Sequence, residues 1–232
     1  MKADMLVKVK GKLIVSCQAL ENEPLHSAWI MSRMAAAAAE GGAAAIRANS
    51  LPDVQQIMET IDLPVIAICK RDYDGSEVFI TATLREVDEL MAAKPTMIAM
   101  DATAHLRPGD LQLPELVAAI RERYPELLLM ADIATVEEAR CAASLGFDGV
   151  GTTLHGYTRE TEGKCLADND YAILREVIEA VKVPVIAEGN VATPEMAADC
   201  LKIGAHAVVV GGAITRPQQI TRRFVNAMSL PA

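Results

Sequence analysis

Short aliphatic runs recur along the chain, and each run stops at a polar residue or a glycine. Successive stops lie 20 to 36 residues apart, so the stretch between two runs is about long enough for one crossover helix. The runs are Leu13–Cys17, Ala44–Ile46, Val65–Cys69, Met97–Met100, Leu127–Ala131, Gly149–Gly151, Val185–Ala187 and Ala207–Val210. Their stops are Gln18, Arg47, Lys70, Asp101, Asp132, Thr152, Glu188 and Gly211. Eight such repeats of strand and helix predict an α/β fold, a (β/α)8 or TIM barrel.

Several stretches between the runs have helical character. Examples are Leu111–Tyr124, Thr135–Leu145 and Pro194–Ile203. The alanine-rich segment Ala35–Ala39 is rich in the strongest helix former and is followed by Gly41 and Gly42, a helix stop. We interpret this segment as part of the first barrel helix.

Composition limits the classes of protein that the chain can be. With 232 residues, 51% of them hydrophobic, the chain suits one barrel domain spanning residues 1–232. The net charge is −9 and basic residues do not cluster beyond Arg222 and Arg223, so we expect no nucleic-acid partner. We expect neither a signal peptide nor a membrane span, because no apolar run is long enough. Five cysteines without a Cys-x-x-Cys pair argue against a disulfide framework and favour the cytoplasm.

The stops at the strand ends form a candidate active site. Because side chains alternate along a strand, we expect six polar stops to point into the barrel mouth, whereas Cys17 and Cys69 point toward the helices. The six are Gln18, Arg47, Lys70, Asp101, Asp132 and Glu188. Any one of them alone could cap the core, but charges that converge on a partly dry opening are costly unless they are paired or used.

Glycines follow the last two runs and predict an anion site. Gly189 and Asn190 come directly after Glu188, and Gly211 and Gly212 follow the eighth run. Glycines there let backbone N–H groups approach a phosphate, as in many barrels of the phosphate-binding type. Arg216, four residues beyond Gly212, could add a fork of donors.

A metal site is not expected. His26, His105, His155 and His206 lie in separate repeats and lack ligand spacing. We interpret His206, which opens a run, as structural, whereas His155 lies in a loop near the mouth where it could touch a ligand. The acidic stops could hold a divalent ion, but Lys70 and Arg47 already bring positive charge there.

Lys70 is the candidate proton carrier. A lysine at a strand end can form a Schiff base or act as a base, and both roles require the neutral amine. Desolvation and a neighbouring Arg47 would lower its pKa, whereas Asp132 or Glu188 nearby would raise it. The sequence leaves the balance of these effects open.

Seven segments together resemble the N-acetylmannosamine-6-phosphate 2-epimerase family. They are Ile14–Gln18, Ile46–Asn49, Lys70–Asp72, Met130–Ile133, Gly151–Leu154 with Gly156–Thr158, Ile186–Gly189 and Val210–Arg216. The resemblance runs from about Gly11 to Met228. It implies a cytoplasmic, cofactor-independent homodimer of sialic acid catabolism that interconverts N-acetylmannosamine 6-phosphate and N-acetylglucosamine 6-phosphate.

The resemblance also implies roles for individual residues. Lys70 matches the family's catalytic lysine and Glu188 its assisting carboxylate. Gln18, Arg47, Asp132 and Arg216 match residues that hold the substrate, and Gly189, Asn190, Gly211 and Gly212 fall in the phosphate site. Two positions depart from the family pattern: Asn190 stands where a basic residue is common, and His155 where serine is common.

The residues fit the reaction independently of the family. In an open-chain sugar, C2 lies beside the C1 aldehyde, so its proton can leave as an enolate forms, and inversion needs reprotonation from the other face. Lys70 would move the proton, while Glu188 orients hydroxyls or aids ring opening. Alternatives are a Schiff-base aldolase using Lys70, and a phosphosugar sensor needing only the glycines. A decarboxylase would need an Asp-x-Lys-x-x-Asp arrangement, which the segment at Lys70 lacks.

Overall fold

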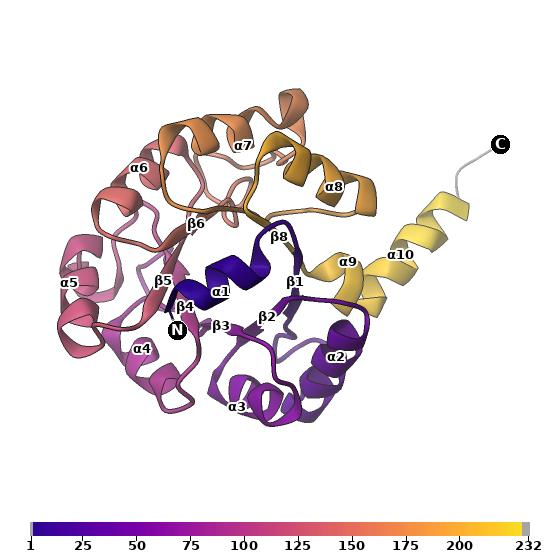
Figure 1. Ribbon diagram of the computed structural model, residues 1–232, viewed down its shortest axis with the longest axis horizontal. Coiled ribbons are helices and arrows are strands. Elements are labelled where there is room, and N and C mark those ends of the chain that lie inside the picture. Colours follow the sequence, from indigo (N-terminus) through magenta and orange to yellow (C-terminus); the bar gives the residue numbers. More distant parts are fainter. Residues whose placement is uncertain (1, 229–232) are drawn as a thin grey trace.

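The eight runs form a closed barrel of parallel strands, which confirms the predicted fold (Figure 1). The computed structural model describes residues 2–228, so residues 1 and 229–232 of the expected 1–232 domain lie outside the described residues. Neighbouring strands pair in chain order and β8 pairs with β1 to close the ring. The strands are β1 Leu13–Cys17, β2 Ala45–Asn49, β3 Val65–Ile68, β4 Met97–Asp101, β5 Leu128–Asp132, β6 Gly149–Gly151, β7 Val185–Ala187 and β8 Ala207–Val210.

Most helices surround the sheet, as the repeat predicts (Figure 1). They are α1 Lys2–Val9, α2 Ala28–Glu40, α3 Leu51–Thr60, α4 Leu84–Met91, α5 Leu113–Arg123, α6 Val136–Ser144, α7 Asp168–Ala180, α8 Pro194–Ile203, α9 Gly212–Thr215 and α10 Pro217–Met228, with a 3-10 turn at Pro108–Asp110. Local signals fix several boundaries. At α6, for example, Thr135 and Glu138 form a reciprocal capping box. No described helix is both long and apolar enough to span a bilayer.

Strand alternation divides the core into two layers. Side chains such as Ile66, Ile68 and Met130 fill the barrel interior. Cys17 and Cys69 belong to the other layer, packed between sheet and helices, as predicted. Strands β2, β4 and β5 extend past the expected ends, so that Arg47, Asp101 and Asp132 lie within strands and keep their inward register.

Helix α1 closes the amino-terminal end of the barrel, a feature that the sequence pattern did not predict. Met5 and Val9 of this helix are buried against the interior residues that begin the strands. The ring of His206 lies 2.6 Å from the backbone oxygen of Leu6 and ties α1 to the start of β8. The structural interpretation of His206 is therefore confirmed, and the open mouth lies at the opposite end.

The last helix differs from the others because it projects away from the barrel (Figure 1). Helix α10 has no buried residue, and its packing contacts are mainly with α9. Phe224, Val225 and Met228 are exposed on it.

Candidate active site

A cavity of about 710 Å³ opens at the carboxyl ends of the strands. Its volume suits a ligand of the size of a phosphorylated sugar. Gln18, Lys70, Glu188 and Arg216 line it, together with Gly189, Asn190, Gly211 and Gly212. The mouth therefore gathers residues from both ends of the chain, as the strand-end pattern predicts. The Oε1 atom of Gln18 is buried without a hydrogen-bond partner, which leaves an acceptor at the wall.

Arg47 binds two carboxylates below this cavity. Its side chain is 1% exposed, and NH1 and NH2 donate to the two oxygens of Asp132 at 3.0 and 2.6 Å. NH1 also lies 3.1 Å from Oε2 of Glu188. Burial lowers the pKa of Arg47, but the charges of Asp132 and Glu188 outweigh it and keep the guanidinium a cation. The carboxylate of Glu188 is therefore held in place by a buried cation.

Two threonines complete the support of Glu188. The hydroxyl of Thr153 lies 2.6 Å from Oδ1 of Asp132 and 3.2 Å from Oε2 of Glu188, so it joins the two acids. Thr152, the sixth stop, exchanges hydrogen bonds with the backbone of Glu188 at 2.7 and 3.0 Å. Both the side chain and the backbone of Glu188 are therefore held.

The two groups expected to handle protons have shifted pKa values. Burial raises the pKa of Glu188 to about 7, although the charge of Arg47 opposes the change. Burial lowers the pKa of Lys70 to about 8, and the nearby charges of Arg47 and Arg216 act in the same direction. Glu188 and Asp132 oppose this shift but do not cancel it. The question that the sequence left open is therefore answered by a pKa lowered to about 8, so that a minor fraction of the lysine is neutral at pH 7 and about half at pH 8.

The backbone around Lys70 is fixed by a short hairpin in the β3–α4 loop. Lys70 pairs with Ile80 in an antiparallel bridge, and its N–H donates to Oδ1 of Asn49 at 2.8 Å. Arg71 then anchors the loop to α4, where its guanidinium pairs with Glu86 and Glu89. This packing sets the point from which the lysine side chain enters the cavity.

Gly189, Gly211 and Gly212 line one part of the cavity, which we call the glycine wall. Gly189 has a φ of +108°, and a Cβ there would lie 3.1 Å from the backbone oxygen of Thr152. Gly211 precedes the short helix α9, whose first N–H groups have no acceptor within the helix. The hydroxyl of Thr215 donates to the backbone oxygen of Ser16 at 2.7 Å and ties this turn to β1. The glycines thus leave backbone N–H groups at this wall without side chains of their own to cover them, although Oε1 of Gln219 lies close to Gly212.

Arg216 lies at the edge of the glycine wall and is held by an acid. Its Nε and NH2 atoms lie 2.7 and 3.1 Å from the two oxygens of Glu23, which also accepts from Gln218 at 2.9 Å. The hydrogen bonds from Arg216 and Leu20 lower the pKa of Glu23 although burial opposes them. The contact fixes one edge of the guanidinium and leaves NH1 for a ligand.

Comparison with known proteins identifies the family. The family model described as N-acetylmannosamine-6-phosphate epimerase matches residues 31–230. A relative from Enterobacter sp. strain 638 is 67% identical over 220 residues, which cover 95% of this chain and 94% of that protein. A relative from Shouchella clausii is 61% identical, covering 97% and 98% of the two chains. Both relatives are assigned as N-acetylmannosamine-6-phosphate 2-epimerases. This chain belongs to the N-acetylmannosamine-6-phosphate epimerase family.

A solved structure supports membership of the epimerase family. The N-acetylmannosamine-6-phosphate 2-epimerase from Clostridium perfringens superposes with a TM-score of 0.91 at 52% sequence identity and covers 96% of each chain. Thiamine phosphate pyrophosphorylase from Pyrococcus furiosus superposes at 0.60 with 20% identity and shares the fold alone.

Some of the expected site residues of this epimerase-family protein line the cavity, and others are buried behind its wall. Gln18, Lys70, Glu188 and Arg216 line the cavity, whereas Arg47 and Asp132 do not. Arg47 contacts Glu188 directly, and Asp132 is joined to Glu188 through Arg47 and Thr153. Asp101 accepts from the N–H and hydroxyl of Thr103 at 2.8 and 2.7 Å, and so shapes the loop that follows β4.

The two positions that depart from the epimerase-family pattern differ in their surroundings. His155 is buried outside the cavity wall, and its Nδ1 lies 2.9 Å from the backbone oxygen of Ala134. Asn190 lines the cavity and accepts a hydrogen bond from the hydroxyl of Tyr157 at 2.7 Å. Among residues 2–228, no group of three or more His, Cys, Asp or Glu side chains is arranged to hold a metal ion.

Sequence reasoning missed Thr153 and Tyr157. Thr153 follows the sixth stop by one residue and Tyr157 lies four residues later in the same β6–α7 loop, and both line the cavity. An adjacent pair of threonines at a strand end was the available signal for Thr153, but a hydroxyl carries no charge that would distinguish it from an ordinary cap.

Proposed function

We propose that the protein interconverts N-acetylmannosamine 6-phosphate and N-acetylglucosamine 6-phosphate. The observation that carries the proposal is the joint presence of Lys70 and Glu188 on one cavity, with pKa values shifted to about 8 and about 7. Groups that titrate near the working pH are suited to proton transfer. The names of the relatives give the substrate, and the glycine wall offers a place for its phosphate.

The reaction follows from the acidity of C2. In the open-chain sugar, neutral Lys70 takes the C2 proton, and the electron pair of the C–H bond moves toward the C1 aldehyde to give an enolate. Return of a proton to the other face of C2 gives the epimer, and no atom is gained or lost overall. The aldehyde stabilises the carbanion, so the step requires neither a nicotinamide nor a metal.

Glu188 assists from the end of β7, across the barrel from β3 and Lys70. Because Arg47, Asp132 and Thr153 hold it, its carboxyl can orient sugar hydroxyls or aid ring opening without moving. In this proposal Arg47 and Asp132 contribute to substrate holding from below the cavity, through Glu188, and Gln18 contacts the sugar directly. Arg47 also offsets the negative charge that the enolate would bring.

The phosphate would bind at the glycine wall. Gly189, Asn190, Gly211 and Gly212 line the cavity, and in this proposal their backbone N–H groups and the NH1 atom of Arg216 donate to the phosphate. Arg223 of α10 also lines the cavity and donates to the backbone oxygen of Ala192 at 3.0 Å. It can supply positive charge near Asn190.

We also propose that the protein is a homodimer. The exposed apolar side chains Phe224, Val225 and Met228 on the projecting helix α10 are typical of an interface. Sedimentation analysis should show a dimer, and Phe224→Asp should shift it toward the monomer; a monomeric wild type would contradict this.

All five cysteines are free thiols, which supports a cytoplasmic location.

Incubation with N-acetylmannosamine 6-phosphate tests the proposed reaction. Proton NMR should show N-acetylglucosamine 6-phosphate appearing, and either sugar should give the same final mixture. A Schiff-base aldolase would instead cleave the sugar and leave a borohydride-reducible adduct on Lys70. A sensor would bind the sugar and leave it unchanged.

A further inference from the structure

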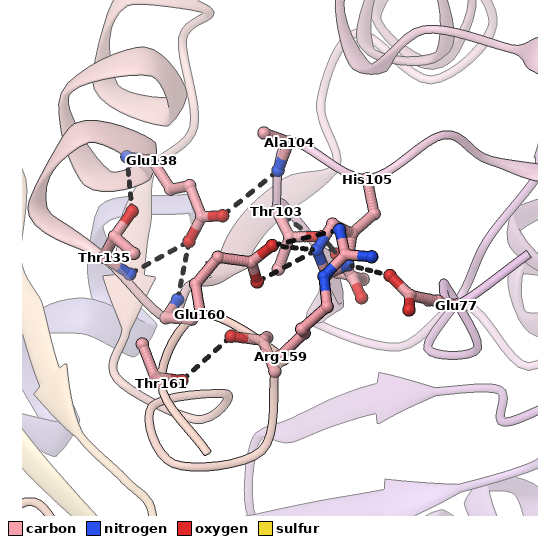
Figure 2. Close-up of polar contacts among 12 residues, drawn as sticks. Glu77, Thr103, Ala104, His105, Thr135, Glu138, Arg159, Glu160 and Thr161 are labelled. Carbon is pink, nitrogen blue, oxygen red and sulfur yellow. Dashed lines mark hydrogen bonds and ion pairs between the residues drawn. The ribbon is translucent and has the colours of Figure 1, made fainter. Parts of the chain in front are cut away.

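His105 lies on the rim of the barrel mouth with a carboxylate at each ring nitrogen (Figure 2). Its Nδ1 lies 3.3 Å from Oε2 of Glu77, and its Nε2 lies 3.1 Å from both oxygens of Glu160. Glu77 belongs to the β3–α4 loop, His105 to the β4–α5 loop and Glu160 to the β6–α7 loop. One imidazole therefore joins three separate loops of the mouth.

The β4–α5 loop that carries His105 is itself fixed to the barrel. The N–H of Ala104 donates to Oε1 of Glu138 at 3.1 Å, at the start of α6 (Figure 2). Arg107 is buried and donates to the backbone oxygen of Asp101 at the end of β4. The backbone around His105 is therefore anchored by two hydrogen bonds. Its ring can in turn hold Glu77 and Glu160 in place.

On one side, the contact with Glu77 restrains the loop that carries the proton carrier. Glu77 lies three residues before Ile80, which lines the cavity and forms the bridge to Lys70. The hydroxyl of Ser76 also donates to the backbone oxygen of Leu106 at 2.9 Å, so this loop has a second tie that does not depend on the imidazole.

On the other side, the contact with Glu160 restrains Tyr157. The turn between them is compact, because the hydroxyl of Thr161 accepts from the N–H of Gly156 at 3.0 Å. Tyr157 lines the cavity and donates to Asn190, beside the glycine wall. A displacement of Glu160 would therefore be passed on to the wall of the cavity.

The contacts depend on the protonation of the ring. Only the imidazolium has an N–H on both nitrogens, whereas the neutral ring turns one lone pair toward a carboxylate. The charged groups around the ring are Glu77, Glu160, Arg159 and Glu138 (Figure 2). The hydrogen bond from His105 lowers the pKa of Glu160 to about 2, which keeps this partner an anion.

We propose that His105 is a positioning residue whose imidazolium ties the β3–α4 and β6–α7 loops to the β4–α5 loop and holds the cavity wall at Ile80 and Tyr157. The tie strengthens as the histidine gains its second proton. Its effect on turnover rests on the proposed epimerase function, whereas its effect on loop motion does not.

The kinetic test compares kcat/KM of the wild type with that of His105→Gln across pH. Titration of Lys70 and Glu188 is common to both proteins and cancels in the ratio. The ratio should be about threefold to tenfold in favour of the wild type at the acid end of the range and fall toward one at the alkaline end, where the ring is neutral. His26→Gln, at an exposed histidine in the β1–α2 loop, should give a ratio near one throughout. A constant ratio for His105→Gln would overturn the proposal.

Hydrogen exchange tests the His105 contacts independently of the proposed epimerase function. In His105→Gln at about pH 6, amides in residues 153–166 should exchange several times faster than in the wild type, and those in residues 71–83 less so because of Ser76. Glu160→Gln should loosen only the first segment, whereas Glu137→Gln, at an exposed acid on α6, should loosen neither. Unchanged exchange in His105→Gln would overturn the tie even in an active enzyme. Altered exchange without turnover would leave the tie standing and contradict the proposed function.

Discussion

The guanidinium of Arg47 lies 3.1 Å from the carboxylate of Glu188 while it also binds both oxygens of Asp132. One buried cation is therefore shared by two acids, and the group of three carries a net negative charge when both acids are ionised. The arrangement explains how a carboxyl can be held firmly at the mouth and still have a raised pKa. It also places Arg47 and Asp132 behind Glu188 and outside the cavity wall.

Asp132→Asn tests the structural importance of this pair. The change leaves buried Arg47 with one charged partner, so we expect the free energy of unfolding to fall by about 3 kcal/mol in urea titrations. Asp88→Asn is a matched control, because the Arg123–Asp88 pair is 51% and 39% exposed and should contribute much less to stability. Equal losses in the two variants would contradict the account.

Thr153→Val removes the hydroxyl between Asp132 and Glu188 but keeps the shape of the side chain. We expect kcat to fall about tenfold with KM nearly unchanged, since Glu188 loses its alignment and not its contact with the substrate. Thr153→Ser should restore most of the rate. Thr60→Val, whose hydroxyl bonds to the backbone of Gln56 on α3, is the control for a threonine elsewhere. A normal kcat in Thr153→Val would count against the support of Glu188 by this hydroxyl.

Glu188→Gln should alter how stability depends on pH. The pKa of Glu188 is raised in the folded protein, so folding favours the protonated acid, and the wild type loses stability as pH rises from about 4.5 to about 7. The glutamine variant lacks this loss. Its advantage in free energy of unfolding should grow through that window and level off at about 3 kcal/mol. A difference between the two proteins that is the same at pH 4 and pH 8 would contradict the raised pKa.

Gly189→Ala and Gly211→Ala separate backbone strain from phosphate binding. At Gly189 a methyl group meets the backbone oxygen of Thr152 at 3.1 Å in a left-handed conformation, so we expect lower stability and weaker binding of inorganic phosphate. At Gly211 the nearest atom would be Cβ of Ser16 at 3.4 Å, an ordinary contact. Gly211→Ala should therefore fold normally and raise KM by severalfold at most. Calorimetric binding of phosphate and thermal melts distinguish these outcomes, and equal behaviour would contradict the account.

The sequence predicted the barrel and much of the mouth because strand alternation is a local rule. A residue at a strand end, such as Glu188, faces the mouth whatever its neighbours are. It could not predict that Arg47 pairs with Asp132, since 85 positions separate them and only the closed ring brings them together. The sign of the pKa shift of Lys70 was open for the same reason, because burial and four charges compete.

Two elements at the ends of the chain also escaped prediction. Helix α1 is only eight residues long, and its role depends on the open end of the barrel beneath it. Helix α10 carries an ordinary amphipathic pattern, which does not reveal that it projects away from its own barrel.

Exchange of the C2 proton in heavy water tests the central claim most directly. Wild-type protein incubated with N-acetylmannosamine 6-phosphate in heavy water should place deuterium at C2 of both epimers, as followed by NMR. Lys70→Ala should lose this exchange by at least about 10³-fold while still binding the phosphosugar in calorimetry. Undiminished deuterium incorporation by Lys70→Ala would contradict the assignment of Lys70 as the residue that moves the proton.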